Sequence, residues 1–194
     1  AAVIGKDVPY ALLEAIAESP AEVLHAGLAR LQGAEFFYET SLYPDIEYTF
    51  KHALTHDVAY GSLLQERRKT LHARIVEAIE RVYANRLGEH AERLAYHAPL
   101  GELWNQAVKY SRQAGQKAFA RSANRDAAAW IEQALTALSH LPQSDDTRTL
   151  EIDLLIDLRN SLLPLAEQDR MHVAVQCAER LAAALNDKRR VSVI

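Results

Sequence analysis

The sequence has little glycine and proline and almost no cysteine. Its 194 residues include seven glycines, six prolines and the single cysteine Cys177. Glycine and proline interrupt helices, so their scarcity in a chain rich in alanine and leucine favours helices over sheets. One cysteine cannot form an intrachain disulfide and is compatible with a reducing compartment. We therefore expect an all-α protein of the cytoplasm.

The sequence also lacks a long apolar run and an excess of positive charge. No stretch reaches the roughly 18 apolar residues of a membrane-spanning helix, and no signal peptide opens the chain. The 22 basic and 26 acidic side chains give a net charge of −4. Non-specific nucleic-acid binding draws on a broad positive field, which this composition does not provide. We expect neither a membrane nor a nucleic acid as partner.

Local signatures of catalysis are missing as well. The sequence contains no G-x-x-x-x-G-K-[ST] loop to hold a nucleotide's phosphates and no G-x-S-x-G nucleophile turn. The sequence therefore predicts a non-catalytic chain, with no cofactor bound to this part of the protein.

Residues 1–64 predict a small domain of helices followed by a β-hairpin. Asp7 is a candidate N-cap for a short helix with Pro9 in its first turn, and a second helix is expected over Ala21–Leu31. The aromatic run at residues 36–38 and the alternating Glu47–Phe50 read as two strands. Two helices followed by a hairpin is the order of a winged helix, so we expect a winged-helix-like segment.

Both ends of the chain resemble interrupted elements. Residues 1–5 read as the last turn of a helix closed by Gly5. In the hairpin described above, Pro44-Asp45 is the expected turn. Residues 188–191 read as the start of a further amphipathic segment. We expect the sequence to be a piece of a longer protein.

Residues 65–194 predict an α-solenoid of antiparallel helix pairs, similar to tetratricopeptide repeats. In the pair between residues 108 and 141, Gly115 and Ala118 of one helix would let the other approach closely, with Ile131 filling the gap. Residues 142–146 read as a polar loop. The helices are expected, after one over residues 53–64, at 67–83, 87–98, 103–121, 124–141, 149–163 and 170–185.

Two stretches of the chain are similar to a known family. They read AAVIGKDVPYALLEAIAESPAEVLHAGLARLQ (residues 1–32) and YTFKHALTHDVAYGSLLQERRKTLHARIVEAIE (residues 48–80). Both resemble the region that follows the ATPase core of bacterial STAND-type signalling ATPases, of the kind fused to class III adenylate/guanylate cyclases. The resemblance implies a regulatory fragment whose partners are an upstream ATPase domain and an unknown protein or ligand bound by the repeats. ATP or ADP would bind elsewhere in the parent protein, and the paired aspartates of a cyclase are not found here.

His52 is the candidate cofactor-binding residue that this resemblance implies. In STAND ATPases a histidine just after a strand contacts the phosphates of bound ADP, and His52 occupies the matching position. Ala53 departs from the pattern, because the related motif has an acidic residue there. A histidine that caps its own helix is the alternative. His52 and His56 could also be metal ligands, but they lack a third ligand at a suitable spacing, so we expect no metal site.

A basic cluster and three aromatic residues have competing interpretations. Residues 67–69 (Arg-Arg-Lys) and Arg74 could contact phosphate, but we expect them to pair with Glu66, Glu77 and Glu80 along the helix. Trp104, Tyr110 and Trp130 could line a peptide groove, but an aromatic residue at such a position more often anchors stacked helices. We therefore expect at least one of the two tryptophans in the core. The alternative function is a DNA-binding transcriptional regulator. Its recognition helix would carry Arg30 as its only positive charge, beside Glu22, which argues against it.

Overall fold

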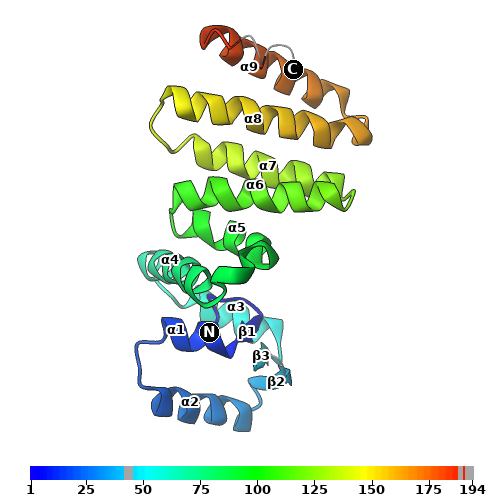
Figure 1. The fold of residues 1–194 in the computed structure, drawn as a ribbon. Helices are drawn as coiled ribbons and strands as arrows, with labels where there is room; N and C mark the ends of the chain where they lie inside the picture. The colour runs from blue at the N-terminus through cyan, green and yellow to red at the C-terminus, as the bar shows by residue number, and fades with distance from the viewer. Residues whose placement is uncertain (42–45, 188–189, 191–194) are drawn as a thin grey trace. The chain divides into compact units, whose positions relative to one another are not determined.

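The computed structural model describes residues 1–41, 46–187 and 190. It divides into two compact units, Ala1–Leu87 with Leu100–Glu102, and Gly88–Pro99 with Leu103–Ile194. The described chain is mostly helical, as predicted, with a small antiparallel sheet near the N-terminus (Figure 1). The sequence analysis places a domain boundary after residue 64, and that boundary stays a prediction. The two units instead describe which parts of the chain are most compact.

The first unit contains the sheet and four helices within the described residues. Its elements are β1 (Asp7–Pro9), α1 (Tyr10–Ile16), α2 (Ala21–Gly33), β2 (Phe37–Ser41), β3 (Glu47–Phe50), α3 (Ala53–Gly61) and α4 (Gln65–Val82). A 3₁₀ segment, η1 (Ala84–His90), follows α4.

The sheet of the first unit has the strand order β1-β3-β2, with both pairings antiparallel. The predicted hairpin strands are confirmed, while the expected turn at Pro44-Asp45 lies outside the described residues. The N-cap role predicted for Asp7 is wrong, because Asp7 starts β1 and pairs with Thr49 of β3. The Thr49 hydroxyl donates to the Asp7 carboxylate over 2.7 Å, and the helix begins only at Tyr10. The predicted order of two helices and a hairpin is therefore preceded by an additional strand, β1.

The start of the chain is a turn and not the end of a regular helix. The backbone N–H of Ile4 donates to the carbonyl of Ala1 over 2.9 Å, and Gly5 has a φ of 135°. A helix-closing glycine would adopt a φ near 60°, so the predicted C-cap is wrong. Val3 and Ile4 are buried, and the turn therefore belongs to the core of the first unit.

The core of the first unit forms where α1 packs against α4. Leu12 of α1 and Ile75, Val76 and Ile79 of α4 are fully buried, as is Val8 of β1. These α4 positions recur at three- and four-residue spacing, which places them on one face of the helix. Burying this apolar face is the main favourable contribution to the unit's stability.

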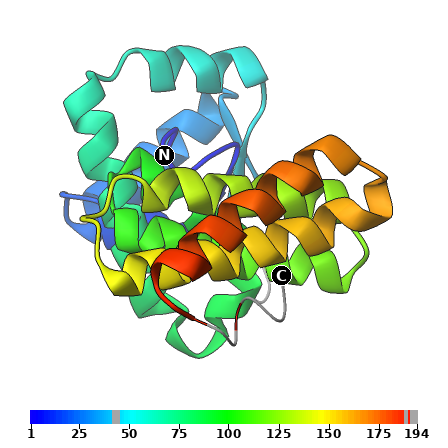
Figure 2. The ribbon, with the colours of Figure 1, turned by 90° about the horizontal axis from the view of Figure 1, so that it is seen from above.

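The second unit is a series of packed helices, which Figure 1 shows one after another and Figure 2 shows from above. Helix α6 packs with α7, α7 with α8, and α8 with α9, so the predicted arrangement in helix pairs is confirmed. The elements are α5 (Ala91–Leu100), α6 (Trp104–Ala120), α7 (Asn124–Leu138), α8 (Asp145–Leu162), the 3₁₀ turn η2 (Leu163–Leu165) and α9 (Gln168–Ala184).

Small residues set the distance between α6 and α7. Ala118, Ala127 and Ala134 are buried at this crossing. A Cβ atom on Gly115 would lie 2.7 Å from Cδ1 of Ile131 and 3.3 Å from the carbonyl oxygen of Ala127. The predicted role of Gly115 as a point of close approach, with Ile131 in the gap, is therefore confirmed.

Helix α8 begins four residues earlier than predicted. Its N-cap is Ser144, whose hydroxyl accepts from the Thr147 N–H over 3.1 Å, while the Thr147 hydroxyl accepts from the Ser144 N–H over 2.8 Å. This reciprocal capping places Asp145 and Asp146 in the first turn, where the helix dipole favours carboxylates. The prediction of a loop through Asp146 is therefore wrong.

Neither tryptophan lies in the core, contrary to the prediction. Trp104 and Trp130 are both half-buried, whereas Tyr110 of α6 is fully buried. The ring of Trp104, the first residue of α6, stacks on the ring of His140, which lies shortly after the last residue of α7. The ring centroids lie 3.8 Å apart, and the planes differ by 7°. The indole thus joins the start of α6 to the segment after α7.

Among the described residues, no helix is both long enough and apolar enough to span a membrane.

We predict opposite effects for two helical glycine substitutions. Gly115→Ala forces a methyl group against Ile131 and should destabilise the protein by about 1–3 kcal/mol, the usual cost of overpacking. Gly27→Ala, within α2, meets no atom within 4 Å and should stabilise it by up to about 1 kcal/mol, because alanine is the better helix former. Urea unfolding of both variants measures the two changes, and destabilisation of equal size by both would contradict this account of Gly115.

Candidate functional site

His52 lies at the junction between β3 and α3 with its side chain exposed. Its backbone is extended (φ −130°, ψ 132°), and its carbonyl accepts from the N–H of Thr55 over 3.1 Å. The imidazole makes no hydrogen bond to the first turn of α3, so His52 is the N-cap residue by position but does not cap through its side chain. The ring is therefore available to a ligand at a helix N-terminus.

Helix α3 has no buried residue. Leu54 and Val58, one turn apart, are 74% and 63% exposed, and Leu64 just beyond the helix is 80% exposed. We call Leu54 and Val58 the α3 apolar surface. Isolated exposed apolar side chains are common, whereas adjacent ones on one helix face can form an interaction surface. This surface continues directly from His52 along the chain.

His56 is engaged within the first unit and does not face a metal site with His52. Its Nε2 lies 2.9 Å from the carbonyl oxygen of Ala2, to which it can only donate, and its Nδ1 lies 3.0 Å from the carboxylate of Asp57. The ring also meets Phe50 edge-on, with 5.2 Å between centroids. Within the described ranges, no three His, Cys, Asp or Glu side chains are grouped so that they could hold a metal ion.

A buried histidine follows in α4. His72 is 1% exposed, and its Nε2 lies 3.1 Å from the hydroxyl of Tyr60. Burial, followed by the nearby charge of Arg68, lowers the pKa of His72 to about 4. The guanidinium of Arg68 lies over the ring of Tyr60, 5.1 Å from its centroid. This cluster joins α3 to α4 and keeps His72 neutral near pH 7.

Arg67, Lys69 and Arg74 of the basic cluster of α4 are paired with carboxylates that the sequence analysis did not name. The carboxylate of Glu18 accepts from Arg67 over 2.9 Å and also from Arg74, and Lys69 pairs with Glu102. The hydrogen bond from Arg67, and then that from Arg74, holds the pKa of Glu18 below its usual value. These carboxylates come from segments far away in the sequence. The pKa of Lys69 is raised by its hydrogen bond to Glu102 and, less strongly, by the charge of the predicted partner Glu66. Three of the cluster's four basic side chains are therefore used in ion pairs within the fold.

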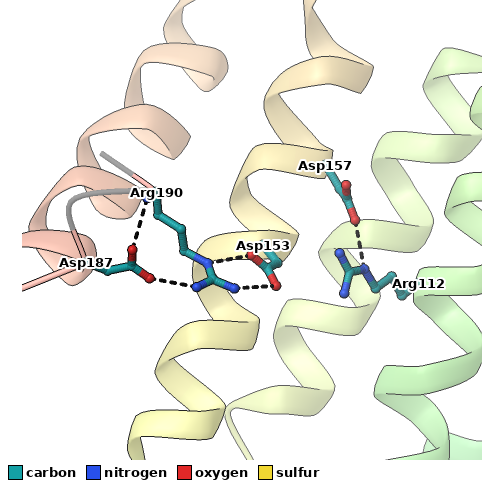
Figure 3. A network of polar contacts seen from close by, with 5 residues as sticks. All are labelled: Arg112, Asp153, Asp157, Asp187 and Arg190. Carbon is teal, nitrogen blue, oxygen red and sulfur yellow. Dashed lines mark hydrogen bonds and ion pairs between the residues drawn. The ribbon is translucent and has the colours of Figure 1, made fainter. Parts of the chain in front are cut away.

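The second unit carries a network of ion pairs that the sequence analysis missed (Figure 3). Asp157 of α8 accepts from Nε of Arg112 on α6 over 2.9 Å. Asp153, one turn earlier on α8, accepts from Nε and Nη2 of Arg190 over 2.8 and 3.2 Å. Arg190 also donates to Asp187 over 2.7 Å. In the sequence, the four-residue spacing of Asp153 and Asp157 places both carboxylates on one face of a helix. The spacing does not reveal which arginines bind them.

Comparisons with known proteins give a limited result. No family model matches the chain, and no solved structure matches it. An uncharacterized protein of Rhizobium meliloti (strain 1021) is 29% identical over 105 residues, which is 54% of this chain. The matched part covers 10% of that relative, so the chain spans about a tenth of its length. The similarity to STAND-type ATPases stays an expectation.

We predict that His72 makes stability fall at acidic pH. Its pKa is near 4 in the folded state and near 6.5 when unfolded, so the unfolded state takes up the proton first. The free energy of unfolding should fall as pH drops from about 6.5 to about 4, by at most about 1.4 kcal/mol per pH unit from this group. Urea unfolding across this range measures the slope.

The matched variants are His72→Leu and His172→Ala. His72→Leu should flatten the slope because it removes the titrating ring, whereas His172→Ala should keep it because His172 is exposed on α9. An unchanged slope in His72→Leu would assign the pH dependence to other groups.

Proposed function

We propose that this chain is a non-catalytic regulatory and protein-interaction module of a larger cytoplasmic signal-transduction ATPase. The parent would be of the STAND type fused to adenylate/guanylate cyclases. The first unit would couple the nucleotide state of an upstream ATPase domain to the helix pairs, which would bind a protein partner. The observation that carries the proposal is the junction at His52, where an exposed imidazole adjoins the α3 apolar surface.

The chemistry of His52 supports a phosphate contact. An imidazole N–H can donate to a phosphate oxygen, and the positive end of a helix dipole favours a bound anion. His52 is exposed and has no hydrogen bond to the first turn of α3, so no bond within the helix would have to break. The ADP would be held chiefly by the upstream domain, because this sequence has no phosphate-binding loop.

The α3 apolar surface supports docking of a folded partner beside that contact. Leu54 and Val58 lie on α3 within six residues of His52 and expose most of their side chains to solvent. Covering such side chains contributes about 25 cal/mol for each Å² removed from water. A change in nucleotide state that moves the partner would uncover or cover this surface, which is how a bistable element shifts its population.

The DNA-binding alternative receives no comparable support. Helix α2, the candidate recognition helix, carries Glu22 in its first turn and Arg30 in its last. Phosphate contacts supply most non-specific DNA affinity and require several basic residues. Three basic residues of α4, Arg67, Lys69 and Arg74, are paired with Glu18 and Glu102.

The test is the ADP affinity of the parent protein, measured by isothermal titration for wild type and His52→Ala. We expect a loss of about tenfold or more, roughly 1.4 kcal/mol. His172→Ala is the control, because His172 is an exposed histidine on α9 and should leave the affinity unchanged.

A second variant tests the same contact in the opposite direction. Ala53→Asp restores the acidic residue of the related motif at an exposed position in the first turn of α3, where a carboxylate is also compatible with the helix dipole. We expect ADP to bind more tightly. Unchanged affinity in both His52→Ala and Ala53→Asp would overturn the nucleotide contact.

A further inference from the structure

The second unit contains a hollow of about 110 Å³ between α6, α7 and α8. An apolar cavity of about 150 Å³ can hold benzene, so a hollow of this size suits one aliphatic side chain. It is lined by Gly115, Gln116, Phe119, Ile131, Asp157, Asn160 and Ser161.

One side of the hollow is apolar. Ile131 is 1% exposed, and Gly115 contributes no side chain that would fill the space in front of it. Phe119 is 44% exposed, although it is one of the largest apolar residues of α6. An aliphatic group placed here would contact all three residues and cover part of the Phe119 ring.

The other side of the hollow offers hydrogen-bonding groups that are not used up. Asp157 accepts from Arg112 through Oδ2, and within the described part of the chain its Oδ1 has no partner. Asn160 accepts from Nε and Nη2 of Arg159 over 3.2 and 2.9 Å, which leaves its amide N–H groups free to donate. The amide of Gln116 is exposed. Ser161, in contrast, already donates to the Asp157 carbonyl.

These groups complement a peptide amide. The free oxygen of Asp157 can accept from an N–H, and the amide nitrogens of Asn160 and Gln116 can donate to a C=O. The hollow suits a neutral ligand, because the Asp157 carboxylate that lines it is already compensated by the guanidinium of Arg112 and leaves no net charge to attract an ion. A charged chain terminus or a lysine side chain therefore fits less well than an uncharged internal segment.

We propose that this hollow binds one main-chain amide and the adjoining aliphatic side chain of an extended segment of a protein partner. This inference rests on the proposed function, since it supplies the partner-binding site of the helix pairs. The aliphatic side chain lies against Ile131 and Phe119, and the amide on the carboxyl side of the same residue bridges Asp157 and Asn160.

The test uses N-acetyl-leucine N-methylamide as the probe and the ¹⁵N–¹H spectrum of the full chain as the readout. Binding is expected at roughly millimolar concentration, as suits a small ligand. The side-chain amide signals of Asn160 and Gln116 and the backbone signal of Gly115 should shift. The methyl ester of N-acetyl-leucine lacks the second N–H and should bind roughly fivefold more weakly, because it loses the bond to Asp157. N-acetyl-leucine, with its carboxylate, should also bind more weakly.

Three alanine variants test which side chains bind the methylamide: Asn160 on α8, and Gln116 and Gln113 on α6. Asn160→Ala and Gln116→Ala should weaken binding of the methylamide, whereas Gln113→Ala, an exposed glutamine on the same helix outside the hollow, should not. Equal binding of amide and ester, or shifts that Asn160→Ala leaves unchanged, would overturn the proposal. The ADP experiment does not involve this probe, so the two proposals can fail separately.

Discussion

Two carboxylates one turn apart on α8 hold together three segments of the second unit. Asp157 binds Arg112 of α6, and Asp153 binds Arg190, which follows α9. The side chains of the two pairs are between 25% and 30% exposed, so water screens them less than it screens surface pairs. The Arg112–Asp157 pair joins two helices separated by the whole of α7. It also fixes one wall of the hollow, because Asp157 lines it, and the geometry of the proposed peptide site depends on this pair.

The two units expose different kinds of surface and suit different partners. The α3 apolar surface consists of the exposed Leu54 and Val58, which follow the exposed His52 along the chain, and we propose it as the contact for a nucleotide-carrying domain. The hollow is small and combines apolar walls with one acceptor and two donors, and it suits a short extended segment. The internal polar contacts differ as well, since Glu18 and His72 are used within the first unit and offer nothing to a ligand. If the chain is the regulatory module proposed above, two such surfaces would let it respond to one partner and act on another.

Sequence patterns predicted what depends on neighbouring residues. The helical periodicity of α4, the alternation of Glu47–Phe50 and the small residue Gly115 opposite Ile131 each carry a local signal. The strand at Asp7–Pro9 had none, because three residues containing Asp and Pro look like the start of a helix and become a strand only by pairing with β3. Glu18 likewise meets Arg67 and Arg74 across 49 and 56 residues, a pairing that helical spacing cannot reveal. The position of His52 was predictable from the resemblance, but the absence of a side-chain cap was not.

The most direct test of this account is a double-mutant cycle between Arg112 and Asp157. Arg112→Met and Asp157→Asn are made singly and together, and the free energy of unfolding is measured in urea at low and at high salt. The account predicts a coupling of about 1 kcal/mol at low salt that shrinks as salt screens the pair. Additive effects within about 0.3 kcal/mol at both salt concentrations would contradict it, because α8 would then not hold α6 through this pair.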